Sequence, residues 1–220
     1  MIGFYNYTVI ITYLSVISAC TSIVFAFSGN IKGAILMLLV SGLCDMLDGP
    51  IARTKKDRTD TERKYGIQID SLSDVISFGV APACIIYNTA VHLSDTGSKW
   101  LIVPAAVVGA ALLVCAVIRL AFFNVSEEER QAADGTKLRD SYRGLPVTNV
   151  ALIYAVFSLA SYFVEGNAFV IIMIVVTALT AFFFVLDFRM VKLHGKKLIL
   201  IGLVGFAVLV GVVLSPLKGF

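Results

Sequence analysis

Hydrophobic residues fall in seven long runs that are separated by short polar segments. The runs cover residues 8–28, 31–52, 67–91, 100–123, 147–164, 167–187 and 198–215. A helix needs about 20 apolar residues to cross the hydrocarbon core of a bilayer, and each run reaches or approaches that length. Backbone polar groups in lipid must bond to one another, which favours helices. The pattern therefore predicts an all-α, polytopic helical bundle with a single membrane domain over residues 1–220.

Composition and charge agree with a membrane protein. Hydrophobic residues make up 58% of the chain, charged residues only 15%, and the mean hydropathy is +0.89, which excludes an ordinary soluble globule. The net charge of +3 does not indicate a nucleic-acid partner, because Lys and Arg are scattered among short loops. Most of them lie in the loops 53–65, 119–146 and 188–197. The positive-inside rule places these loops in the cytoplasm.

The same rule predicts the orientation of the whole chain. The alternate loops and the carboxyl terminus hold only Lys32, Lys99 and Lys218. We therefore expect a multi-pass protein of the cell inner (cytoplasmic) membrane, with its amino terminus inside and its carboxyl terminus outside.

Four carboxylates interrupt two consecutive apolar runs. Asp45 and Asp48 are three residues apart, and Asp70 and Asp74 are four apart, so each pair lies on one helical face. At 1.5 Å per residue, Asp45 lies roughly 12 Å before Arg53, and Asp74 lies roughly 12 Å beyond the start of the next run. Because the two helices run antiparallel from one loop, the pairs can meet at similar depth.

Four anions in a medium of low dielectric repel one another unless they take up protons or bind a cation. Oxygen ligands favour a hard ion such as Mg²⁺, Mn²⁺ or Ca²⁺. The two histidines, His92 and His194, lie outside the carboxylate runs, so zinc and haem fit poorly. The Asp residues could instead cap helices or pair with Arg53, but carboxylates within membrane helices point first to function.

The order and spacing of these residues resemble the signature of the CDP-alcohol phosphatidyltransferase family. The matching pattern is Asp45-x2-Asp48-Gly49-x2-Ala52-Arg53 followed by Gly66-x3-Asp70-x3-Asp74. The segment between Arg53 and Gly66 holds twelve residues, more than the family pattern has. The first six runs fit the family's six-span architecture, and the run 198–215 is an extra carboxyl-terminal span.

The resemblance implies a divalent-metal-dependent transferase that displaces CMP from a CDP-activated lipid with an alcohol. It implies a site with two Mg²⁺ or Mn²⁺ ions, facing the cytoplasm, in a homodimer surrounded by membrane lipids. Asp74 would be both a metal ligand and the general base. The other implied roles are metal binding for Asp45, Asp48 and Asp70, and CDP-lipid binding for Asp45, Gly49, Ala52, Arg53 and Gly66.

The acceptor alcohol is indicated by three further stretches. Residues 70–82, 118–125 and 143–146 resemble those of bacterial and archaeal phosphatidylserine synthases, which implies CDP-diacylglycerol and L-serine as substrates. The candidate ligands for serine are Arg119, Arg143, Asn124, Ser73 and Ser77. Basic residues at helix ends can instead fix topology, and small polar residues can serve helix packing.

Three alternatives remain at this point. Glycerol 3-phosphate or an inositol compound could replace serine, although a phosphorylated acceptor calls for a more basic pocket than the late runs offer. The Asp cluster could be the site of an ion transporter, but no matching half occurs later in the chain. A structural scaffold would leave the ordered motif unexplained. Substrate-dependent CMP release would separate the enzyme from the last two.

Overall fold

The computed structural model describes residues 3–95, 99–134, 141–191, 205 and 207–217. The α-helices are α1 (Tyr7–Phe27), α2 (Ile31–Ala52), α3 (Asp60–Asp74), α4 (Ala81–Leu93), α5 (Ile102–Asp134), α6 (Asn149–Ser158) and α7 (Gly166–Val185). Short helical turns are η1 (Val75–Val80), η2 (Lys99–Leu101) and η3 (Leu159–Tyr162). Two three-residue strands, β1 (Ser141–Arg143) and β2 (Arg189–Val191), pair antiparallel.

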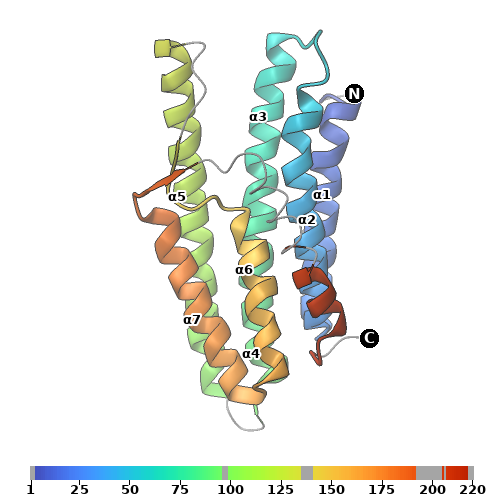
Figure 1. Ribbon diagram of the computed structural model, residues 1–220, viewed down its shortest axis with the longest axis vertical. Coiled ribbons are helices and arrows are strands. Elements are labelled where there is room, and N and C mark those ends of the chain that lie inside the picture. The colour runs from blue at the N-terminus through green and yellow to red at the C-terminus, as the bar shows by residue number, and fades with distance from the viewer. Residues whose placement is uncertain (1–2, 96–98, 135–140, 192–204, 206, 218–220) are drawn as a thin grey trace.

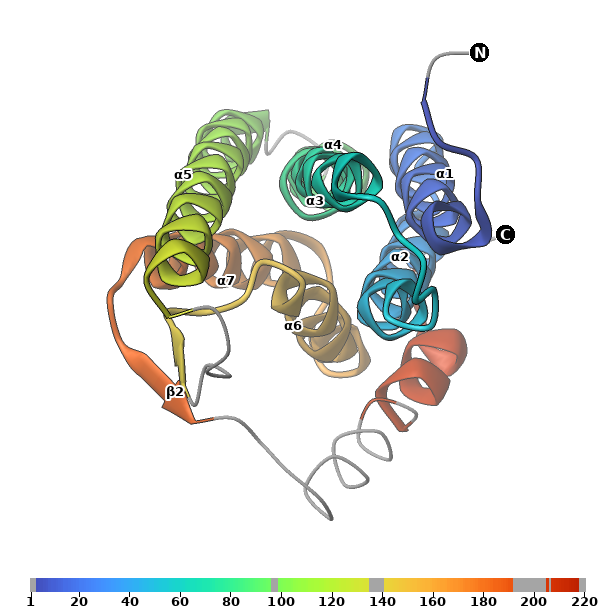
Figure 2. The same cartoon turned by 90° about the horizontal axis from the view of Figure 1, so that it is seen from above.

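Within these residues, five helical segments are long and apolar enough to cross a membrane, and they run over Tyr7–Phe27, Ile31–Ala52, Asp60–Leu93, Lys99–Glu129 and Gly166–Val185. A shorter apolar helix covers Asn149–Tyr162. The segments stand side by side in a bundle (Figures 1 and 2). This confirms the predicted all-helical membrane bundle.

Small hydroxyl residues join α1 to α2. Ser18 donates to the carbonyl of Met37 at 2.7 Å, and Ser22 donates to that of Ala34 at 2.7 Å. The Ser15 and Ser41 hydroxyls lie 2.8 Å apart. Small residues let helix backbones approach closely in lipid, where helix association gains little from the hydrophobic effect. The pairing holds α2, which carries half of the carboxylate motif, in a fixed register against α1.

The carboxylate-bearing helix α3 is the first part of one long rod. Helices α3, η1 and α4 run without a break from Asp60 to Leu93, and η1 is π-helical. Pro82, the second residue of α4, lies just beyond η1 and lacks an N–H, so the carbonyl one turn earlier, at Phe78, loses its usual partner. A π-turn accommodates such a missing bond within a continuous helix and is common at functional sites.

Several predicted boundaries were wrong in the same way, because polar helical turns extend beyond the apolar runs. The third span begins at Asp60 and not at residue 67, since Thr59 and Glu62 form a reciprocal capping box at its start. Half of the lengthened loop after Arg53 is therefore helix. The segment from Asn124, predicted as a loop, continues α5 to Asp134.

The first part of the predicted seventh span 198–215, residues 198–204, lies outside the described residues, as does residue 206. Its described part is helical up to Leu214. The hydroxyl of Tyr162 donates to the carbonyl of Gly211 at 2.9 Å, and the ammonium of Lys32 donates to that of Val213 at 3.4 Å. The described part of this segment therefore packs against η3 and the start of α2.

We call one end of the bundle the open end, because α6 and α7 do not extend to it (Figure 1). The α2–α3 loop and the far end of α5 project at this end beyond the levels at which α6 begins and α7 ends (Figure 1). Helix α5 packs against α4 and α7, whereas α6 packs against α2 and α7. The start of α6 is consequently the floor beneath the projecting parts of α2, α3 and α5.

Candidate functional site

The carboxylates of α2 and α3 meet near this floor. One oxygen from each of Asp45, Asp70 and Asp74 lies within 4.8 Å of the others, and all three side chains are partly buried. Asp48 lies against Asp70. The meeting follows from the antiparallel course of α2 and α3, which places the end of one helix beside the start of the other (Figure 1). The spacing in the sequence therefore translates into one four-carboxylate cluster.

Two threonines from other helices orient the cluster. Thr148, just before α6, donates to Oδ2 of Asp45 at 2.9 Å, and Thr12 of α1 donates to Oδ2 of Asp48 at 3.4 Å. Sequence reasoning missed both residues, since they lie far from the motif along the chain and belong to no charged pattern. The one signal that could have singled out Thr148 is its place two residues after the stretch 143–146, which resembles known synthases.

The electrostatics of the cluster favour a hard cation. Thr12 and Thr148 are neutral, so their hydroxyls do not offset the repulsion among the carboxylates. Oδ1 of Asp70 is buried and has no hydrogen-bond partner. An orphaned carboxylate oxygen that is held beside two further carboxylates is an available ligand for a divalent ion, and an all-oxygen donor set suits Mg²⁺ or Mn²⁺. The residues present fit the metal that the motif implies.

The small residues of the motif lie one helical turn nearer the open end. Ala52 is four residues after Asp48, and Gly66 is four residues before Asp70. A side chain at Gly66 would collide with Arg58, because a Cβ there would lie 2.6 Å from the Nη2 atom. Gly49 is more open, with Arg53 Nη1 at 3.8 Å from its Cβ position.

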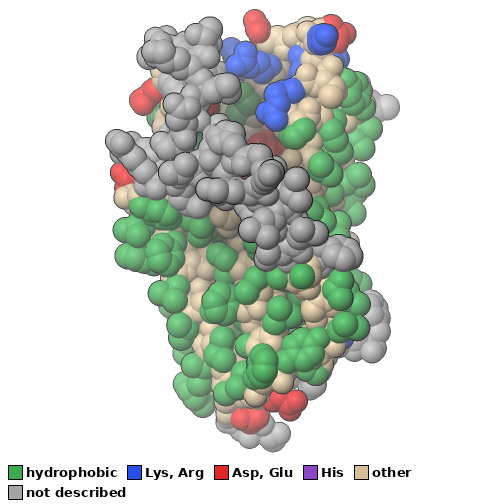
Figure 3. All heavy atoms as spheres, viewed as in Figure 1, with side chains coloured by type: hydrophobic (Ala, Val, Ile, Leu, Met, Phe, Trp, Pro, Cys, Tyr) green, Lys and Arg blue, Asp and Glu red, His purple; other side chains and the backbone are tan. Residues whose placement is uncertain are grey.

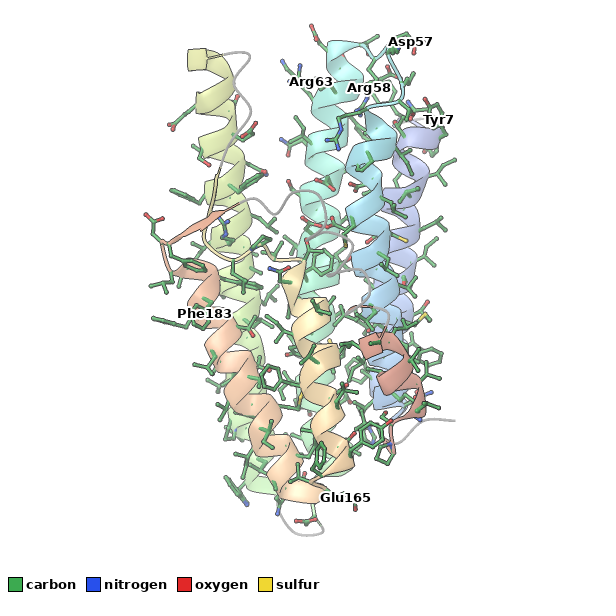
Figure 4. The ribbon with its side chains drawn as sticks, viewed as in Figure 1. Tyr7, Asp57, Arg58, Arg63, Glu165 and Phe183 are labelled. Carbon is green, nitrogen blue, oxygen red and sulfur yellow. The ribbon has the colours of Figure 1, made fainter. Side chains whose placement is uncertain are left out.

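Basic side chains surround this end of the molecule. Acidic side chains are recessed beneath Lys and Arg side chains in Figure 3. Figure 4 shows Asp57, Arg58 and Arg63 at the same end of the bundle as Tyr7, opposite Glu165. The basic side chains attract an anionic ligand to this end of the bundle, and the recessed carboxylates attract a cation.

The α2–α3 loop is held to the start of α3 by a hydrogen-bonded ion pair. Lys55 Nζ donates to Oε1 of Glu62 at 2.7 Å, and Asn6 Nδ2 donates to the same oxygen at 3.0 Å. The bond from Glu62 raises the pKa of Lys55 above its ordinary range. Glu62 also accepts from the Thr59 N–H at 3.0 Å. One carboxylate thus joins the amino-terminal segment, the loop and α3.

Among the predicted serine ligands, the described side chains make separate contacts. Asn124 Nδ2 on α5 donates to the Ser71 hydroxyl on α3 at 2.7 Å, which places it beside the carboxylate helix. Ser73 is buried on α3. The Ser77 hydroxyl is buried and lies 3.4 Å from that of Ser15, so it faces the α1–α2 interface.

Arg119 is buried beneath the segment that leads into α6. Its Nε donates to the carbonyl of Leu145 at 3.2 Å, and its guanidinium lies 5.9 Å from the ring centre of Phe123. Gly144, with a φ of +71°, passes directly over it, since a Cβ there would lie 3.5 Å from the guanidinium. Arg119 therefore fixes the approach to Thr148. The backbone of Arg143 pairs with that of Arg189 across β1 and β2. The side chain of Arg143 is not among those that the structure describes.

Comparison with known proteins identifies the class. The CDP-alcohol phosphatidyltransferase family matches residues 5–186, a range that contains the whole carboxylate cluster and α1 through α7. The chain therefore belongs to the CDP-alcohol phosphatidyltransferase family, as the motif predicted.

Curated relatives carry names of serine-specific members. The chain is 35% identical to archaetidylserine synthase of Methanothermobacter thermautotrophicus over 77% of this chain and 64% of that protein. It is 38% identical to CDP-diacylglycerol–serine O-phosphatidyltransferase of Mycobacterium leprae over 61% of this chain and 40% of that protein. For the Helicobacter pylori (strain 26695) protein of the same name, identity is 32% over 74% and 62%. The chain thus spans less than two thirds of each of these relatives.

Proposed function

We propose that this protein transfers the phosphatidyl group of CDP-diacylglycerol to the hydroxyl of L-serine and releases CMP, with a divalent cation bound. The observation that carries the proposal is the convergence of Asp45, Asp70 and Asp74 within 4.8 Å, inside the motif of a family defined by this reaction type. The names of the relatives support serine as the acceptor.

The reaction is a displacement at the lipid-linked phosphorus. The serine oxygen forms a bond to that phosphorus, the bond to the oxygen of CMP breaks, and CMP leaves with the electron pair. Asp74 accepts the proton of the serine hydroxyl. Two Mg²⁺ or Mn²⁺ ions at Asp45, Asp48, Asp70 and Asp74 would supply charge stabilisation on the diphosphate. Positioning and electrostatics dominate catalysis of such transfers.

The bundle suits a substrate that is half lipid. The acyl chains of CDP-diacylglycerol belong in the bilayer, whereas CMP and serine are water-soluble. A cluster close to one end of membrane-crossing helices meets both needs, because it lies within reach of the aqueous phase. We infer that the open end faces the cytoplasm across the inner membrane, and that Gly49, Ala52, Arg53 and Gly66 contact the CDP group.

The test is CMP release by the purified protein with CDP-diacylglycerol and Mg²⁺ or Mn²⁺, comparing serine, glycerol 3-phosphate, inositol and no acceptor. We expect release with serine alone, phosphatidylserine as the product, and loss of release after chelation of the metal. Restored metal should restore release. Release with another acceptor would retain the family reaction and reject serine.

A folded protein that releases no CMP with any acceptor would favour an ion transporter or a scaffold. Uptake of Mn²⁺ into sealed proteoliposomes would then separate these two classes. The predicted homodimer is checked independently, by light scattering of the purified protein after gel filtration. A mass of one chain would reject it.

A further inference from the structure

Arg58 occupies a place that the motif does not explain. It lies in the lengthened α2–α3 loop, outside the matching residues, yet its guanidinium lies against the two small residues of the candidate CDP site. Nη1 is 3.4 Å from the carbonyl of Ala52, and Nη2 lies 2.6 Å from the position of a Cβ on Gly66. Figure 4 shows Arg58 at the end of the bundle where α2 and α3 meet.

The hydrogen bonds of Arg58 leave one buried donor without an acceptor. Its contacts to the carbonyls of Ala52 and Glu62 measure 3.4 and 3.5 Å, at the long limit for hydrogen bonds. The Nε atom is buried and has no acceptor. A buried donor without a partner is costly, and a bound acceptor would remove that cost. The guanidinium is therefore held by weak contacts, and its Nε lacks an acceptor that an entering ligand could supply.

The position of Arg58 selects the ligand. Ala52 and Gly66 are each one helical turn from the carboxylate pair Asp48 and Asp70, so Arg58 lies roughly 6 Å nearer the open end than the cluster. A CDP-lipid whose diphosphate is held at the carboxylates has its CMP phosphate on the side of the open end, toward Arg58, because its acyl chains run the opposite way. Guanidinium groups recognise phosphate by paired N–H donors.

Resting on the proposed function, we propose that Arg58 is a nucleotide-binding residue that donates to the phosphate of the CMP half of the CDP-lipid. Gly66 leaves room for the guanidinium, because a Cβ there would lie 2.6 Å from Nη2 and would shift it. The lengthened loop thus supplies a substrate ligand of its own, in addition to the family motif. As the CMP phosphate gains charge on leaving, the same contact stabilises the leaving group.

The experiment measures CMP and cytidine binding by titration calorimetry of the purified full chain with Mg²⁺, without acceptor. Arg58→Ala should weaken CMP binding roughly 10- to 100-fold, the effect of one hydrogen bond to a charged group. Cytidine, which lacks the phosphate, should bind both proteins within about twofold, since Arg58 contacts only phosphate. Lys56→Ala is the matched control, because Lys56 is an exposed cation of the same loop. It should leave CMP binding within about twofold, as exposed charges are screened.

Steady-state kinetics separate a ligand from a brace of the loop. With Arg58→Ala, KM for the CDP-lipid should rise while KM for serine stays unchanged, and Arg58→Lys should restore part of the loss. Equal CMP binding in Arg58→Ala and Lys56→Ala would overturn the proposal. Tighter CMP binding in Arg58→Ala would also overturn it, because the Arg58 side chain would then hinder CMP binding. If the wild type still releases CMP with serine, only Arg58 is rejected. A folded wild type that neither binds CMP nor releases it rejects both proposals.

Discussion

In the proposed mechanism, Asp74 is the residue on which the chemistry depends most. It shares the cluster with Asp45 and Asp70, where an amide of the same size could occupy the space but could not accept a proton. We expect Asp74→Asn to lower serine-dependent CMP release by roughly 10²- to 10⁴-fold while CDP-lipid binding survives. Asp57→Asn, an exposed carboxylate of the loop, should leave release unchanged. Turnover retained in Asp74→Asn would exclude Asp74 as the base.

Thr148 orients Asp45, which is a proposed metal ligand. Its hydroxyl donates to Asp45 at 2.9 Å, and partners of ligating groups typically affect metal affinity by 10- to 100-fold. Thr148→Val should therefore raise the Mg²⁺ concentration for half-maximal CMP release by about that factor. Thr148→Ser keeps the donor and should behave as the wild type. An unchanged Mg²⁺ requirement in Thr148→Val would show that the bond does not position the ligand.

At the scale of elements, the start of α3 is set by polar contacts and not by an apolar run. The Thr59 hydroxyl accepts a hydrogen bond from the Glu62 N–H, and the Glu62 carboxylate accepts one from the Thr59 N–H. Thr59→Ala should destabilise this turn by about 1 kcal/mol, seen as faster amide hydrogen exchange at residues 61–63. Thr61→Ala, an exposed position in the same turn, should not speed exchange. Equal exchange in both variants would contradict the cap.

The ion pair of Lys55 with Glu62 should respond to pH in a defined window. The pKa of Lys55 is raised in the folded protein by its bond to Glu62. The contribution of Lys55 to stability is therefore complete below the unfolded pKa of about 10.4 and is lost as pH rises through the folded value. Exchange at residues 60–63 should not accelerate through loss of this pair between pH 6 and 9. Lys55→Met should remove any acceleration of exchange at these residues above pH 10. If the acceleration persists in Lys55→Met, it comes from the titration of another group.

At the scale of the whole molecule, two helical segments are longer than a bilayer needs. The Asp60–Leu93 rod holds 34 residues, or about 50 Å at 1.5 Å per residue, whereas the hydrocarbon core is about 30 Å thick. The excess of this rod and of α5 stands at the open end (Figure 1). The carboxylates thus lie below projecting helices that shield them from bulk solvent on two sides.

The orientation of the bundle predicts which loops meet which solution. Lys56 and Lys99 are exposed and lie at opposite ends of the Asp60–Leu93 rod. In a protein freed of its four native cysteines, Lys99→Cys should react with an impermeant maleimide on intact cells, as its loop is predicted outside. Lys56→Cys should react only after permeabilisation. The reverse labelling would invert the proposed topology and place the site outside.

Residue types and their spacing along the chain were enough to predict the fold class and the members of the carboxylate cluster. Lengths of apolar runs are enough to define membrane helices, since lipid leaves no other partner for the backbone. Spacings of three and four residues placed each Asp pair on one face, and a short loop forced α2 and α3 to run antiparallel. The capping box at Thr59 was also readable, although hydropathy alone placed the start of α3 too late.

The residues that hydrogen-bond to the cluster from distant parts of the chain could be found only from the packing of the helices. Thr12 and Thr148 reach the cluster because α1 and α6 pack beside α2, and no local pattern encodes such packing. The packing also buries Arg119, which donates a hydrogen bond to the carbonyl of Leu145 in the segment before α6. Arg58 gained its place over Gly66 from the course of one loop. Side-chain chemistry and helical period are local properties of the chain, whereas proximity between helices arises from packing the whole bundle.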